Sequence, residues 1–158
     1  MIPELDISSP AAALWSAGVL GFLVGLVPIG LAEVMALAIG AVQPPELALS
    51  MLLVFTVAHV AGKVGWYVLG TFADRVTHAR SRALIARARA VLSRYPHYSL
   101  SVLGLSALVS VPPFHLAAIA AGIVRLPFVR FVLVCLSGRL VRFGMLASVP
   151  ALIRGWLG

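Results

Sequence analysis

Two long apolar runs, at residues 46–72 and 128–152, constrain this chain more than any other feature. A helix needs about 20 apolar residues to cross the roughly 30 Å hydrocarbon core of a bilayer, and each run is longer than that. Hydrophobic residues make up 61% of the 158 residues and charged residues only 11%, too few for the surface of a soluble domain. The sequence therefore predicts an all-α integral membrane protein.

Two further apolar segments are interrupted by proline. The first contains Pro28 between Gly25 and Gly30, and the second contains Pro112 and Pro113. We predict a single integral membrane domain over residues 1–158. Its five parts are a first hairpin at 13–45, a span at 46–72, a cytoplasmic arginine-rich segment at 74–97, a second hairpin at 99–127 and a span at 128–152.

The two halves of the chain resemble each other in spacing. Residues 38–45 match residues 120–127, and each match joins a proline-broken segment to a long span. Interrupted segments in corresponding positions of two halves are typical of transporter sites. The sequence therefore favours an inverted-repeat-like arrangement of two hairpins and two or more transmembrane helices.

The distribution of arginine favours re-entrant hairpins over complete crossings. Six arginines fall between the halves, namely Arg75, Arg80, Arg82, Arg87, Arg89 and Arg94. If both broken segments crossed the membrane, Arg125 and Arg130 would lie on the opposite side from these six, against the positive-inside rule. If both segments turn back, at Pro28 and Gly30 and at Pro112 and Pro113, all these arginines share the cytoplasmic face.

These features resemble the DedA family, bacterial members of the VTT or SNARE-associated Golgi protein superfamily. The stretch from Gly62 to Gly70, GKVGWYVLG, resembles its Gly-x-x-Gly-x-Tyr-x-x-Gly motif. The first hairpin matches in Pro28 and Glu33, and the second in Pro112-Pro113, Ala121-Gly122, Pro127 and Phe131. The resemblance implies opposed re-entrant hairpins in the bacterial inner membrane and movement of lipids between leaflets, including undecaprenyl phosphate.

The chain departs from the family pattern at charged positions. Lys63 stands where the family has an acidic residue, and Val109 or Ser110 and His115 stand where it has arginines around the second hairpin prolines. The acidic residue that the family has about a dozen positions after Glu33 is also missing.

Ionisable residues at membrane depth are the candidate site. At 1.5 Å per residue, Lys63 lies about 14 Å from Phe72, and Arg139 and Arg142 lie about 14 and 18 Å from Arg130. These three bases outnumber the single acid at this depth, Glu33. Uncompensated positive charge is costly there, so an anion or water is expected to approach. Arginine donates bidentate hydrogen bonds to phosphate. We therefore predict that five residues bind a lipid headgroup: Glu33, Lys63, His115, Arg139 and Arg142. The alternative is a structural Glu33–arginine pair with water.

Three further residues are candidates for lining a path, namely Gln43, His59 and Tyr67, although packing explains such side chains equally well. We expect no metal and no cofactor, because the histidines are scattered and no metal-binding spacing occurs, and we expect no enzymatic activity. Nucleic acid is not an expected partner, since the arginines lie between apolar runs. A homo-oligomer remains open.

The predicted function is transport of an anionic phospholipid or polyprenyl phosphate between leaflets, as a flippase or scramblase, in a multi-pass inner-membrane protein. Two alternatives remain at this stage. One is a proton-coupled exporter of small molecules or ions, and the other is a membrane assembly protein without transport.

Overall fold

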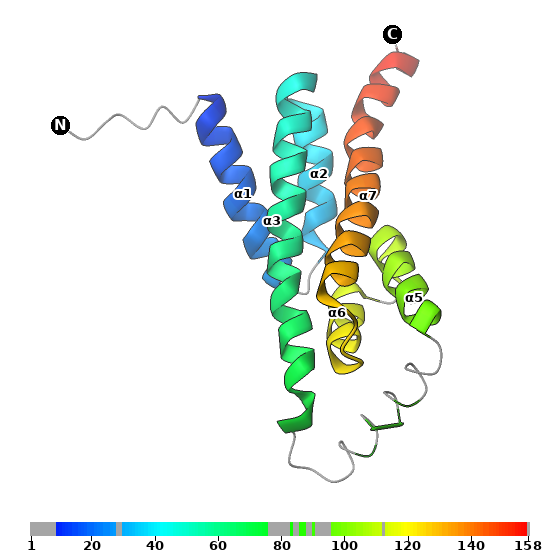
Figure 1. Cartoon of the computed structure of the whole chain (residues 1–158). Helices are drawn as coiled ribbons and strands as arrows, with labels where there is room; N and C mark the ends of the chain where they lie inside the picture. The colour runs from blue at the N-terminus through cyan, green and yellow to red at the C-terminus, as the bar shows by residue number, and fades with distance from the viewer. Residues whose placement is uncertain are drawn as a thin grey trace, which may run out of the picture. The chain divides into compact units, whose positions relative to one another are not determined.

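The computed structural model describes residues 9–27, 30–75, 83, 86, 87, 90, 96–111 and 113–157, and these residues are helical or in connections, without a strand. Figure 1 shows the helices in chain order. Their bounds are α1 Pro10–Leu26, α2 Leu31–Val42, α3 Pro45–Thr71, the 3-10 helix η1 Phe72–Arg75, α5 Pro96–Val109, α6 Phe114–Ile123 and α7 Phe128–Leu157. The predicted all-α class is confirmed over the described residues.

Two of the described helices are long and apolar enough to cross a membrane. They are α3 with 27 residues and α7 with 30, which correspond to about 40 and 45 Å. Their bounds match the predicted spans at 46–72 and 128–152 closely. Helix α7 continues past residue 152 to Leu157 and accommodates Pro150, although proline removes a main-chain donor.

Each proline-interrupted segment is divided into two shorter helices. Helix α1 ends before Val27, whose backbone is extended, and α2 begins after Gly30. Helix α5 ends at Val109, Ser110 has a positive φ of 62°, and α6 begins after Pro113. Helix α1 contacts α2 and α5 contacts α6, and Figure 1 shows that the helices of each pair run in opposite directions.

The predicted turn residues Pro28 and Pro112 lie outside the described residues. So does most of the predicted cytoplasmic segment at 74–97, including Arg80, Arg82, Arg89 and Arg94. The prediction of one membrane domain over the whole chain stays a prediction.

The chain forms two compact units. Unit 1 comprises residues 1–62 and 140–158, and unit 2 comprises residues 63–139. The division falls within α3 and within α7, so each unit contains one helix pair and a part of each long helix.

Close helix approach over small residues holds unit 1 together. A side chain built on Gly21 of α1 would place its Cβ 2.5 Å from the Phe55 carbonyl oxygen of α3. A Cβ on Gly25 would likewise lie 2.5 Å from the His59 carbonyl oxygen. Gly40 of α2 lies directly against the Ala147 backbone of α7. The apolar core that results includes Ala17, Val24, Ala32, Ala36, Ile39, Met51, Phe55 and Phe143.

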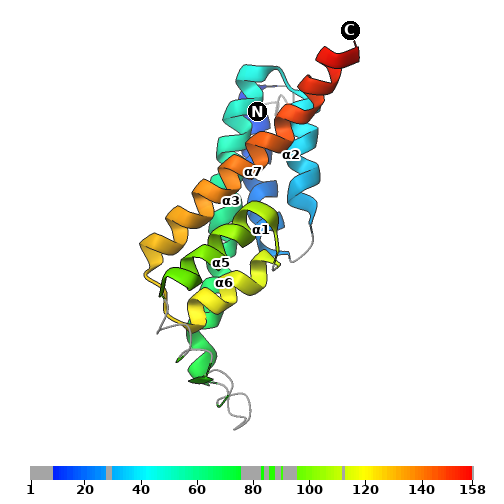
Figure 2. The same ribbon diagram turned by 90° about the vertical axis from the view of Figure 1, so that its right-hand side faces the viewer.

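Unit 2 uses the same kind of packing. Gly70 of α3 and Gly122 of α6 lie against each other's helices, and a Cβ on Gly138 of α7 would lie 2.6 Å from the Ala107 Cβ of α5. Figure 2 shows α5 and α6 side by side. Buried side chains of this unit include Leu103, Phe114, Ala118, Leu126, Phe131 and Cys135.

Candidate functional site

In unit 1, the predicted residues Glu33 and Arg142 form an ion pair. Arg142 Nε donates to Glu33 Oε1 at 3.1 Å, and each side chain is 22% exposed. Glu33 lies in the first turn of α2, where the helix dipole also favours a carboxylate. The pair is neutral as a whole and joins α2 to α7, so its geometry matches the structural alternative that the sequence left open.

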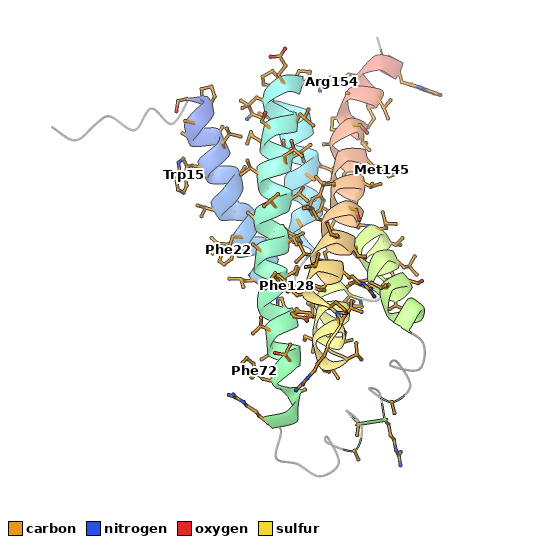
Figure 3. All side chains as sticks on the ribbon, viewed as in Figure 1. Trp15, Phe22, Phe72, Phe128, Met145 and Arg154 are labelled. Atoms are coloured by element: carbon orange, nitrogen blue, oxygen red, sulfur yellow. The ribbon has the colours of Figure 1, made fainter. Side chains whose placement is uncertain are left out.

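A second arginine joins the same two helices. Arg154 of α7, labelled in Figure 3, donates to the Ala41 carbonyl at 3.3 Å and to the Gly40 carbonyl at 3.5 Å. These carbonyls belong to the last turn of α2, where the helix leaves its acceptors unsatisfied and a cation is favourable. The two arginines of unit 1 thus hold opposite ends of α2.

The path-lining candidates of unit 1 are a buried histidine and the residue that ends α2. His59 is 2% exposed, and its ring lies 6.1 Å from the Phe55 ring and 5.5 Å from the Phe143 ring, centroid to centroid. Gln43 is half-buried and caps α2, since its main-chain N–H donates to the Ile39 carbonyl. Gly30 occupies the N-cap position of α2 and is exposed.

An apolar groove of about 550 Å³ lies on α1 and α3 of unit 1. Trp15 and Phe22, both labelled in Figure 3, line it together with Leu14, Gly18, Val19, Leu23, Val54 and Ala58. These side chains offer no charged or hydrogen-bonding group beyond the Trp15 indole. The groove therefore suits hydrocarbon and not a charged headgroup.

In unit 2, two basic side chains are buried. Lys63 is 4% exposed and Arg139 is 3% exposed. The Arg139 guanidinium carbon lies 4.2 Å from the centroid of the Phe114 ring, a cation–π distance. Phe114 is the first residue of α6, directly after Pro113, so Arg139 lies beside the break between α5 and α6.

The charge balance of the two units differs sharply. Ten of the twelve lysines and arginines fall in the sequence of unit 2, against a single acidic residue, Asp74. Asp74 belongs to η1, which follows the end of α3. Unit 1 has the other two bases and the other four acids. Burial of charge is expensive unless opposite charge or hydrogen bonds compensate for it, and unit 2 has little carboxylate to supply.

The remaining candidates of unit 2 are aromatic or lie beside aromatic rings. His115 is half-buried, and its ring centroid lies 5.8 Å from that of Trp66. Tyr67 is 9% exposed, and its hydroxyl donates to the Leu126 carbonyl at 2.7 Å. The Tyr67 ring also lies 4.6 Å from the Phe131 ring, so this residue fixes the corner between α6 and α7.

The five predicted headgroup residues are therefore divided between the units. Glu33 and Arg142 lie in unit 1 and contact each other, whereas Lys63, His115 and Arg139 lie in unit 2. Sequence reasoning missed Phe114 as the ring beneath Arg139. A signal existed, because an aromatic residue directly after a hairpin proline is well placed to receive a cation.

The described residues contain no group of three or more histidine, cysteine, aspartate or glutamate side chains that could hold a metal ion. No protein-family model, no curated protein and no solved structure matches this chain.

Proposed function

We propose that this protein moves an anionic lipid between the leaflets of a bilayer. The observation that carries the proposal is the burial of Lys63 and Arg139 in a unit whose sequence has one acidic residue. Both residues belong to helices that are long and apolar enough to cross a membrane. A phosphate headgroup offsets the buried positive charge, and arginine and lysine both bind phosphate well.

The helix pairs supply the second part of the mechanism. We propose that α1–α2 and α5–α6 are re-entrant hairpins whose breaks lie within the bilayer, in an inverted-repeat-like arrangement. Non-helical backbone at that depth must be covered by protein or line a wet cavity. Phe114 is the first residue of α6 and contacts Arg139, so the break before α6 lies beside this arginine. Water and a headgroup would reach the buried cation at this point.

Glu33 and Arg142 have a positioning role in this proposal. Their ion pair holds α2 on α7 within unit 1, and Arg154 holds the other end of α2. Headgroup binding then rests on Lys63 and Arg139, with His115 as a further donor close to Trp66. The substrate class is a phosphate-bearing lipid, either an anionic phospholipid or a polyprenyl phosphate.

The resemblance to the DedA family supports the same assignment, and we propose that the protein is a multi-pass protein of the bacterial inner membrane. The stretch from Gly62 to Gly70 carries this resemblance and contributes Lys63 to unit 2. We do not propose that lipid movement is coupled to protons. A carboxylate would be needed to carry the proton, and Lys63 stands where the family has an acidic residue.

A leaflet assay in liposomes tests this function. The purified chain is reconstituted with a fluorescent anionic lipid, and a membrane-impermeant reductant bleaches the outer leaflet. Wild-type protein should expose the inner-leaflet lipid to bleaching, whereas the double variant Lys63→Met, Arg139→Gln should protect it as protein-free vesicles do. The matched control is Arg87→Gln, which removes an exposed arginine of unit 2 outside the proposed site.

The outcomes separate the proposal from its alternatives. Folded wild-type protein that leaves the inner-leaflet lipid protected contradicts lipid movement. Uptake of a soluble substrate driven by a pH gradient would instead indicate the exporter, and its loss in Glu33→Gln would identify the coupling residue. An assembly protein without transport would retain its cellular role after neutral replacement of all five charged or histidine candidates.

A further inference from the structure

One end of unit 2 carries exposed arginines around a rigid corner, which we call the basic corner. It consists of Arg75 on η1, Arg125 between α6 and α7, and Arg130 in the first turn of α7, together with Phe72 and Phe128. All three arginines are exposed, and the two phenylalanines are 46% and 50% exposed. Figures 1 and 2 both show η1 and the start of α7 toward the same end of this unit.

The packing of unit 2 holds these elements in place. Helix α6 contacts η1, and the glycine approach of Gly70 to Gly122 fixes the end of α3 against the end of α6. The Tyr67 hydroxyl binds the Leu126 carbonyl, one residue after Arg125, at 2.7 Å. The exposed arginines therefore project from a framework of buried contacts.

The backbone at Arg125 is the most informative feature of this corner. Its φ is 53°, in the left-handed region that usually holds glycine after a helix end. The Arg125 N–H donates to the Gly122 carbonyl at 3.0 Å, and the Leu126 N–H donates to the Ala121 carbonyl at 2.9 Å, as in a Schellman cap. Glycine would fit this position without strain, yet the chain has an exposed arginine there. Non-glycine residues with a left-handed backbone are concentrated at functional sites.

We infer that the basic corner is a docking site for the phosphate headgroups of anionic membrane phospholipids such as phosphatidylglycerol. Three exposed guanidinium groups are complementary in charge to such headgroups. The sequence of unit 2 contains a single acidic residue that could compete with phosphate for them. Phe72 and Phe128 enter the acyl-chain boundary beside them, in the manner of interfacial aromatic residues. The Arg75 guanidinium lies 4.5 Å from the Phe72 ring centroid, so the apolar and charged parts adjoin.

This docking site is distinct from the buried pair that the proposed function uses. Its arginines are exposed, whereas Lys63 and Arg139 are almost fully buried. It needs no movement of lipid between leaflets, and it holds headgroups at the membrane surface by charge. Each arginine near an anionic surface is expected to contribute about a fivefold change in affinity, equivalent to about 1 kcal/mol.

Lipid titration followed by native mass spectrometry tests the docking site. The full chain, purified in a neutral detergent, is titrated with phosphatidylglycerol and separately with phosphatidylcholine. Wild-type protein should prefer phosphatidylglycerol, and the double variant Arg125→Gly, Arg130→Gln should weaken that binding about 25-fold if the two contributions add. Arg125→Gly suits the left-handed backbone, so this variant retains the fold. Arg154→Gln, which removes an arginine of unit 1, is the control and should bind as wild type does.

Two further experiments distinguish a lipid ligand from free phosphate and distinguish surface docking from leaflet transport. Added inorganic phosphate at the same concentration should leave the lipid bound, and equal displacement would overturn a lipid site in favour of a free-anion site. The variant Lys63→Met, Arg139→Gln should retain the preference for phosphatidylglycerol even where leaflet transport is lost. Equal affinity of wild type for the two lipids, or unchanged affinity in the Arg125→Gly, Arg130→Gln variant, would overturn the docking site.

Discussion

The two units of this chain pack their helices in the same way and differ in the surroundings of their charged residues. In each unit, a pair of short apolar helices packs on parts of α3 and α7 through glycines that leave no room for a side chain. In unit 1 the partly exposed Arg142 meets Glu33, and the charges cancel. In unit 2 the buried Lys63 and Arg139 lie in a sequence with one acidic residue, and Arg139 lies over the Phe114 ring.

We propose that the charges of unit 1 serve the fold and that the buried charges of unit 2 serve a ligand. An ion pair that joins two helices is satisfied within the protein, so its loss should lower the free energy of unfolding. The buried bases of unit 2 are the residues that we propose to bind a lipid phosphate, so their loss should lower transport.

Glycine substitutions test the packing that the units share, and they should have the largest effects. Gly40→Val in unit 1 and Gly122→Val in unit 2 both force a side chain into a neighbouring helix backbone. Each should lower the free energy of unfolding by about 3 kcal/mol or more, measured by denaturant titration in detergent. Gly144→Ala is the matched control, because nothing lies within 4 Å of its added Cβ. A tolerated Gly122→Val beside a destabilising Gly40→Val would show that the packing of unit 2 differs.

Loss of the carboxylate in unit 1 should have the next largest effect. Glu33→Gln leaves Arg142 partly buried beside a neutral amide, so we expect a loss of about 2 kcal/mol in unfolding free energy. The double variant Glu33→Gln, Arg142→Gln should recover much of this loss, which a double-mutant cycle measures. Additive losses would mean that the pair does not join α2 to α7 energetically.

The corresponding change in unit 2 should cost less stability. Lys63→Met removes a buried charge together with its desolvation cost and leaves an apolar side chain of similar length, so the unfolding free energy should fall by less than in Glu33→Gln. Leaflet transport by the same variant should fall strongly. Destabilisation comparable to that of Glu33→Gln, with proportional loss of transport, would assign Lys63 to the fold.

The smallest effect is expected at the basic corner. Arg125→Gly relieves the left-handed strain but adds freedom to the unfolded chain, so a net gain of about 0.5 kcal/mol in unfolding free energy is expected. Arg125→Ala, which retains the strain, should show no such gain. A loss of stability in Arg125→Gly would mean that the arginine side chain is required for the cap.

The sequence predicted the long helices and the interrupted segments because these depend on local composition. Residues 45–71 and 128–157 are apolar over more than the length of a membrane span. Proline at 28, 112 and 113 disfavours a continuous helix, although α7 accommodates Pro150. These properties need no knowledge of tertiary packing.

The partners of the charged residues could not be predicted, because they depend on helix register. The sequence predicts that Arg139 and Arg142, which are three residues apart, bind the same headgroup. Three residues rotate about 300° around a helix and rise about 4.5 Å, which leaves room for different neighbours. Arg142 meets Glu33, 109 residues away in the sequence, whereas Arg139 meets Phe114. Only the packing of α2 and α6 distinguishes these two environments.

Binding of a lipid phosphate by the buried bases of unit 2 can be observed directly in an experimental structure of the chain in nanodiscs that contain an anionic phospholipid. We expect density for a phosphate within about 3 Å of the Arg139 guanidinium or the Lys63 ammonium. Well-ordered side chains of Lys63 and Arg139 that bind only protein carbonyl groups and water, with no phosphate beside them, would contradict it.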